Sequence, residues 1–168
     1  NGALVNTATA ELVVASAGSG SIVFHDCTVT APGMIAYMEG GRVVMELCTV
    51  EQSGNVNPFR IGKAGSNSLN DVTLEILGTR YRNSAPSGTV FVMFMGRPGD
   101  VNIKIGEYNG VMSNLYTGYG VQFRNEGVKA DSARTRLNFE FDGVYWYGFN
   151  YLFIGDLTWD GAANPELT

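Results

Sequence analysis

Residues that bind metals or carry redox chemistry are scarce in this chain. Its 168 residues include one histidine, His25, and two cysteines, Cys27 and Cys48. These residues cannot form a Cys/His zinc set, a CxxC redox pair or an HExxH motif. We therefore expect no metal site and no cofactor.

Basic residues and long apolar runs are scarce as well. Eleven Lys and Arg residues stand against 16 Asp and Glu residues, which gives a net charge of −5. This is the wrong sign for binding a phosphate backbone, and the basic residues are scattered rather than clustered. No uninterrupted run of about 18 apolar residues is present, so the sequence predicts no membrane insertion. Nucleic acid is likewise not an expected partner.

Hydrophobic residues and glycines are plentiful by contrast. The chain is 45% hydrophobic and has 22 glycines but only 5 prolines. A chain of this length and composition can bury one core of ordinary size, so disorder and coiled coil are excluded. We predict a single domain over residues 1–168.

A weak internal repeat gives the strongest indication of the fold. Five segments align without gaps, and each alternates apolar with polar or variable residues: Ile22–Asp26, Val43–Leu47, Val72–Ile76, Val101–Ile105 and Leu137–Phe141. A period of two is typical of a strand with one buried face. The inward positions are all apolar except Asp26, and we expect their side chains to form the core.

A second predicted strand separates successive copies of the repeat. These strands are Met34–Met38, Pro58–Ile61, Val90–Met95, Val121–Phe123 and Tyr151–Ile154, and four of the five are followed closely by glycine. Short strands that recur with Gly-rich turns predict an all-β fold, a parallel β-solenoid of about five coils over residues 22–157. We expect a leading strand or short helix within residues 1–20 and a tail at 158–168. An antiparallel sandwich is the alternative, but it does not explain why like residues recur in register.

Stacking the copies would align their outward residues in a column of His25, Glu46, Glu75, Lys104 and Glu140. In this alignment Glu46 is directly beside Glu75. A carboxylate pair can serve a glycosidase as acid and as nucleophile or base, so both residues are candidate catalytic groups. The alternative is a solvated charge ladder in which Lys104 bridges Glu75 and Glu140 while His25 offsets Glu46.

Two cysteines follow the first strand of neighbouring copies, because Cys27 and Cys48 both begin a Cys-Thr-Val sequence. Stacked coils would bring them close enough for a disulfide. The interpretation we favour is a pair of free, buried thiols at a bend, followed by an outward threonine and an inward valine.

Most aromatic residues lie at or after residue 108, many of them in turns rich in Gly and Asn. Aromatic faces beside Asn, Asp and Thr suit sugar rings, which present apolar C–H faces and peripheral hydroxyls. The carbohydrate-binding candidates are Tyr116, Tyr119, Tyr145, Trp146, Tyr147 and Tyr151. Alternatively, these rings close the last coils or contact neighbouring subunits.

The coils at Val43–Val50 and Val72–Thr79, with glycine-terminated second strands and Tyr/Asn-rich insertions, resemble the right-handed parallel β-helices of the pectin-lyase-like superfamily. Among these they are most similar to bacteriophage tailspikes and tail appendages. The resemblance covers roughly residues 20–157 and implies an extracellular homotrimer on a virion tail that recognises bacterial surface polysaccharide. Because the chain is short for a tailspike, it also implies a fragment of a longer fibre. It supplies no position-by-position catalytic signature.

Three functions therefore remain open for this chain. It could be a polysaccharide-binding module, a glycan-cleaving hydrolase or lyase that uses Glu46 and Glu75, or a structural segment that trimerises or caps a fibre. We expect the isolated chain to bind carbohydrate without cleaving it. Only Glu46 and Glu75 form a predicted carboxylate pair, and the slots beside them, Val44 and Thr73, offer little to orient a sugar.

Overall fold

The computed structural model describes residues 2–5, 12–15, 20–62, 70–85, 89–95, 99–124, 136–155 and 166–167. All regular structure in these ranges is β-strand, so the expected all-β class is confirmed. In this part of the chain no helix is long and apolar enough to cross a membrane. The strands are β1 (Gly2–Val5), β2 (Val13–Ala15), β3 (Ser21–His25), β4 (Cys27–Ala31), β5 (Ala36–Met38), β6 (Gly41–Glu46), β7 (Thr49–Gln52), β8 (Phe59–Ile61), β9 (Val72–Leu77), β10 (Arg80–Asn83), β11 (Val90–Met95), β12 (Val101–Arg124), β13 (Arg136–Gly155) and β14 (Glu166–Leu167).

Every strand pair in the sheet is parallel, and each strand from β1 to β9 pairs with the strand that comes three later in the chain. This pattern produces three rows of strands. The first row contains β3, β6, β9 and the initial parts of β12 and β13. The second row contains β1, β4, β7, β10 and the middle parts of β12 and β13. The third row contains β2, β5, β8, β11 and the final parts of β12 and β13. The parallel pairing excludes the antiparallel sandwich.

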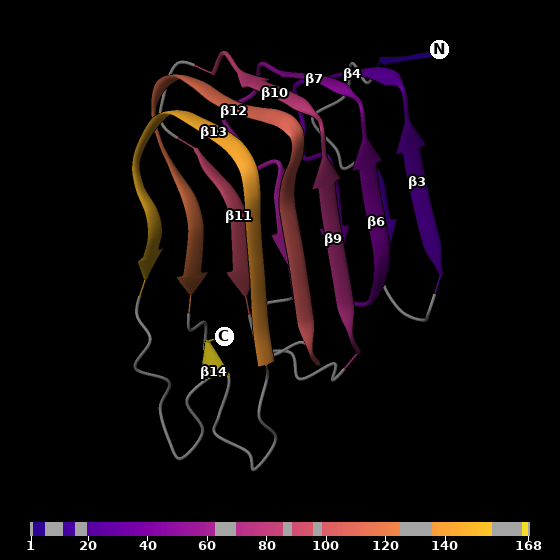
Figure 1. Ribbon diagram of the computed structural model, residues 1–168, viewed down its shortest axis with the longest axis vertical. Helices are drawn as coiled ribbons and strands as arrows, with labels where there is room; N and C mark the ends of the chain where they lie inside the picture. Colours follow the sequence, from indigo (N-terminus) through magenta and orange to yellow (C-terminus); the bar gives the residue numbers. More distant parts are fainter. Residues whose placement is uncertain are drawn as a thin grey trace.

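The sheet curls into a half-barrel (Figure 1). Strands β3, β6 and β9 stand side by side, the second row crosses the top of the view, and β11 descends in the third row. The long strands β12 and β13 each pass through all three rows. The sequence predicted the first and third rows. It missed the second row, because its strands follow the first-row strands after only one or two residues.

A left-handed backbone residue makes the tight corner between the first and second rows. Asp26, Leu47, Gly78 and Gly143 hold this corner with φ between 49° and 59°. Only glycine adopts such angles without strain, and Asp tolerates them better than most residues. At Gly78 a Cβ atom would also come within 2.8 Å of the Leu47 side chain and 3.1 Å of Tyr108. The corner therefore fixes where each first-row strand ends.

The core lies inside the curl and contains most of the predicted inward set. Nine of its residues are buried: Val43, Met45, Val72, Leu74, Ile76, Val101, Ile103, Ile105 and Leu137. Two predicted members are exposed instead. Ile22 is 39% exposed because β3 is an edge strand of the first row among the described residues, and Leu47 is 46% exposed because it forms the corner.

Aromatic rings fill the core toward β13. Phe91 is buried and contacts Phe59, Tyr81 and Trp146 edge to face, with ring centroids 4.8–5.7 Å apart. The half-buried β13 rings pack on this centre, and we call them the aromatic end cluster: Phe139, Phe141, Trp146 and Phe149, with the more exposed Phe153. The first two belong to the predicted inward set. They are only half-buried because, of the described strands, only the two-residue β14 pairs with the far edge of β13.

The N-terminal segment that could have been a helix contains a strand. Residues Val13–Ala15 form β2 and pair in parallel with β5. This agrees with the preference of β-branched valines for extended backbone. The rest of residues 6–19, apart from Leu12, lies outside the described residues.

Candidate functional site

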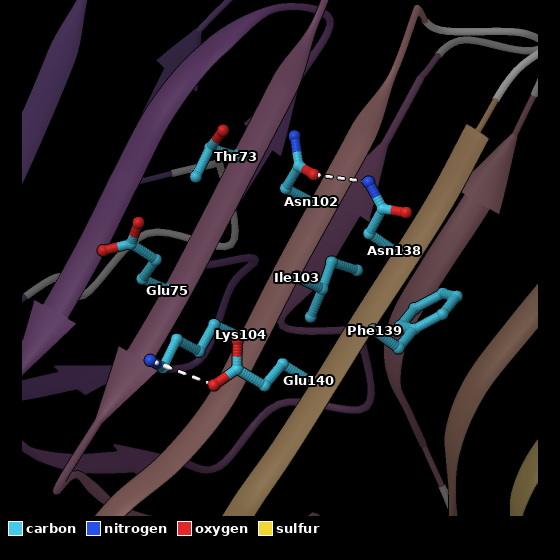
Figure 2. Close-up of a pocket in the computed structure, with 8 residues that line it drawn as sticks. All are labelled: Thr73, Glu75, Asn102, Ile103, Lys104, Asn138, Phe139 and Glu140. Atoms are coloured by element: carbon cyan, nitrogen blue, oxygen red, sulfur yellow. Dashed lines mark hydrogen bonds and ion pairs between the residues drawn. The ribbon is translucent and has the colours of Figure 1, made fainter. Parts of the chain in front are cut away.

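Polar side chains cover the outer face of the first row, where they line an open groove of about 460 Å³. Figure 2 shows the groove across β9, β12 and β13, lined by Thr73, Glu75, Asn102, Ile103, Lys104, Asn138, Phe139 and Glu140. The alternation of the strands explains this arrangement, since the even-numbered first-row residues of β12 and β13 point outward while the odd-numbered ones enter the core. We call Arg42, Thr73, Glu75, Asn102, Lys104, Asn138 and Glu140 the polar ladder.

Two amides form the middle of the polar ladder. Asn102 and Asn138 are paired across β12 and β13, and Asn138 Nδ2 donates a hydrogen bond of 2.7 Å to Asn102 Oδ1. Thr73 continues the same column on β9. An amide carries two donor hydrogens and two acceptor lone pairs. This column therefore presents closely spaced donors and acceptors one strand apart.

Ion pairs flank the amides in the neighbouring column. Lys104 Nζ lies 3.1 Å from Glu140 Oε1 and 2.5 Å from Glu107 Oε1. Hydrogen bonds to these two carboxylates raise the pKa of Lys104, and the bond to Glu107 has the larger effect. The contact with Glu140, shown in Figure 2, confirms half of the expected Lys104 bridge.

Glu75 has a different partner from the one the sequence predicted. Arg42 on β6 holds it with two hydrogen bonds, from Nη2 to Oε2 at 2.7 Å and from Nε to Oε1 at 3.3 Å. The predicted contact between His25 and Glu46 is present, with Nε2 3.9 Å from Oε2. Both cations of the polar ladder are therefore already paired with carboxylates.

The expected pairing of Glu46 with Glu75 is wrong by two residues. In the sheet Glu75 is opposite Val44, and Glu46 is opposite Leu77. A shift of two residues keeps every apolar residue on the same face, so the period-two pattern cannot detect it. The corner decides the register, because Leu47 is aligned with Gly78 when both strands end at their left-handed residue. This shift also brings Arg42 into the polar ladder.

An exposed tyrosine lies near one end of the polar ladder. Tyr108 is 67% exposed and stands at the β12 corner, next in sequence to the Glu107 that contacts Lys104. The β12 corner contains residues 107–110, whereas the neighbouring corners have only two residues, 78–79 and 143–144. Sequence reasoning did not single out Tyr108, although the extra corner residues before Gly110 were a usable sign.

The predicted aromatic candidates fall into separate groups. Tyr145 and Tyr147 are exposed on β13. Trp146 between them turns inward and contacts Phe149, with ring centroids 4.9 Å apart. Tyr151 is exposed and stacks on Tyr119, with centroids 6.3 Å apart and planes 5° from parallel. The side chain of Tyr116 lies outside the described residues. Trp146 therefore belongs to the aromatic end cluster, which is the alternative role that the sequence left open.

The cysteines occupy the bend that the sequence predicted for them. Both are free thiols, Cys48 is buried, Cys27 is half-buried, and their sulfurs lie 3.6 Å apart. The following threonines, Thr28 and Thr49, are exposed, as expected. Burial raises the pKa of the Cys48 thiol to about 11.

Among the described residues, no group of three or more His, Cys, Asp or Glu side chains gathers closely enough to hold a metal ion. Comparison of the chain with protein-family models, with curated proteins and with solved structures finds no match. The polar ladder and its groove are therefore the basis for any functional assignment.

Proposed function

We propose that the chain is a polysaccharide-binding module built on a right-handed β-helix of about five coils. Three observations support the helix: the pairing of each strand from β1 to β9 with the third strand after it, the parallel direction of every pair, and the repeated left-handed corner. A solenoid gives the outer face a regular ladder of side chains one strand spacing apart, about 4.8 Å.

The observation that carries the binding proposal is the amide pair Asn102–Asn138 in an open groove. An exposed tyrosine, Tyr108, lies at the corner where β12 leaves the first row. Neighbouring hydroxyls on a sugar ring donate and accept hydrogen bonds in turn, and so do these amides. Tyr108 offers an aromatic face for the C–H side of a sugar ring. A polysaccharide aligned with the stacking axis would place successive rings over successive strands.

The charges of the groove favour a neutral polysaccharide. Lys104 and Arg42 are its cations, and each is already bonded to a carboxylate. With Glu75, Glu107 and Glu140 opposing two cations, the groove has a formal charge of −1. An acidic polysaccharide would have to displace these partners, which costs free energy that a neutral chain avoids.

Binding without cleavage is the function we favour. A glycosidase needs two carboxylates that face one another across the scissile bond. Glu46 and Glu75 are not opposite each other in the sheet, and Glu75 is held by Arg42. The roles in a virion tail, in a homotrimer and in attachment to a bacterial surface rest on the resemblance to tailspikes alone, and they stay predictions.

The proposal is tested with immobilised bacterial capsular and O-antigen polysaccharides, neutral and acidic. We expect retention on neutral polysaccharides. In the Asn102→Ala/Asn138→Ala double variant we expect a loss of affinity of about thirtyfold, since two lost hydrogen bonds contribute about 1 kcal/mol each. The control is Thr49→Ala, an exposed threonine on the second row. Equal retention of the double variant and wild type would show that the groove is not the binding site.

Two further measurements separate the alternatives. New reducing ends that disappear in Glu46→Gln or Glu75→Gln would establish the enzyme. A stable trimer in sedimentation, with no polysaccharide retained, would establish the structural role.

A further inference from the structure

Cys27 and Cys48 occupy the same corner position on neighbouring strands. The register on both sides is fixed, because Phe24 pairs with Met45 before the corner and Thr28 pairs with Thr49 after it. Adjacent strands of a sheet are about 4.8 Å apart, within the Cα separation of about 4.4–6.8 Å that a disulfide requires. The two sulfurs lie 3.6 Å apart, so a bond needs only a small movement of the side chains.

We propose that Cys27 and Cys48 are a disulfide-forming site, at which a small-molecule disulfide such as oxidised glutathione cross-links two successive corners of the sheet. The inference does not depend on the polysaccharide-binding proposal.

The exposure of the two thiols sets the order of the steps. Cys27 is half-buried and open to attack, whereas Cys48 is 2% exposed and its thiol lies 3.4 Å from the Phe24 carbonyl oxygen. The Cys27 thiolate attacks one sulfur of oxidised glutathione, forms a mixed disulfide and releases one glutathione. The Cys48 thiol then loses its proton, attacks Cys27 Sγ and releases the second glutathione. Two protein thiols are oxidised and one glutathione disulfide is reduced to two thiols.

The cross-link would anchor the most exposed strand of the first row. In β3, Ile22 is 39% and Val23 is 54% exposed, and β6 is its only partner among the described strands. Cys27 follows β3 at the corner, and Cys48 follows β6. A bond between them would therefore tie the edge strand β3 to the more buried strand β6. A loop closed by residues 21 apart in sequence restricts the unfolded chain.

The test incubates the purified chain with oxidised or with reduced glutathione and then counts free thiols after denaturation. We expect oxidation to remove both thiols, to lower the mass by two hydrogen atoms and to raise Tm by about 5–10 °C. Cys27→Ser should show no such rise. Cys48→Ala should stop at the first step and retain one glutathione on Cys27.

Three results would overturn the inference: two free thiols that persist in the oxidised sample, a mixed disulfide that accumulates in the wild-type chain, or a disulfide that joins two chains. The thiol count and mass of the wild-type chain decide the matter even if a variant fails to fold.

Discussion

Arg42 and Glu75 form a bidentate ion pair across β6 and β9, at 2.7 Å and 3.3 Å. The pair lies at the edge of the groove. Among the described residues of β3, β6 and β9, Arg42 is the only lysine or arginine. Because the Arg42 side chain is 44% exposed, solvent screens the pair, and its effect on stability is small. On the proposed function, we expect its effect on ligand choice to be larger.

Glu75→Gln should therefore change what the groove binds more than how stably the protein folds. The substitution frees the Arg42 guanidinium and changes the formal charge of the groove from −1 to 0. We expect the free energy of unfolding to change by less than about 1 kcal/mol. We also expect retention on acidic polysaccharides to rise relative to neutral ones. Urea denaturation and the polysaccharide array measure the two effects, and Arg42→Gln, which removes the cation, should not show the second. Increased retention in both variants would contradict the charge argument.

Gly78→Ala should destabilise the fold by about 1–3 kcal/mol, because alanine at φ 55° is strained and its Cβ would press on Leu47 and Tyr108. Two glycines provide matched controls. Gly143→Ala has the same kind of φ but nothing within 4 Å of its new Cβ, so it should cost about 1 kcal/mol. Gly20→Ala has neither problem and should be nearly neutral. If thermal or urea denaturation gave equal losses at Gly78 and Gly143, the crowding at the corner would be disproved.

Ile103→Asp should destabilise the protein severely, by more than about 4 kcal/mol, because it buries an unpaired charge in the core. Ile103 is 2% exposed. The control is Val23→Asp, which places the same carboxylate on an outward residue that is 54% exposed and should change stability by about 0.5 kcal/mol or less. The two variants are compared by circular dichroism during urea unfolding. Similar midpoints would contradict the assignment of Ile103 to the core face and Val23 to the outer face.

The buried thiol of Cys48 predicts a loss of stability in alkali. Its pKa is about 11 in the folded protein and near 8.5 in an unfolded chain. As the pH rises from about 9 to 11 the unfolded chain loses this proton first, so the free energy of unfolding falls through that window. Under reducing conditions the fall should be smaller in Cys48→Ala than in wild type, with both measured by urea denaturation at pH 8 and pH 10.5. Parallel pH profiles would show that Cys48 does not contribute.

The apolar alternation of the chain predicted much of this architecture. Val101 pairs with Val72 and with Leu137, as the repeat indicated, because buried residues on successive strands must lie on the same face. Alternation alone could not place β6 against β9. That register depends on the corner at Leu47, and nothing in an apolar residue signals a left-handed backbone.

The candidate site was predictable only in part, for the same reason. Lys104 and Glu140 were placed correctly beside one another, since they lie on strands whose register was right. Arg42 was missed because the predicted register of β6 against β9 was wrong by two residues. Tyr108 was missed because its exposure comes from a longer corner, and a longer corner is a property of the backbone path rather than of strand periodicity.

The left-handed corner has a consequence for how this protein can vary. Residues 107–110 are two longer than the corners on either side, yet Ile105 still pairs with Ile76 before them and Val111 still pairs with Arg80 after them. Chain length at the corner is thus uncoupled from the register of the rows. Additional residues can be inserted there to present new side chains at the surface while the core keeps its packing, so the outer surface and the core can vary at different positions.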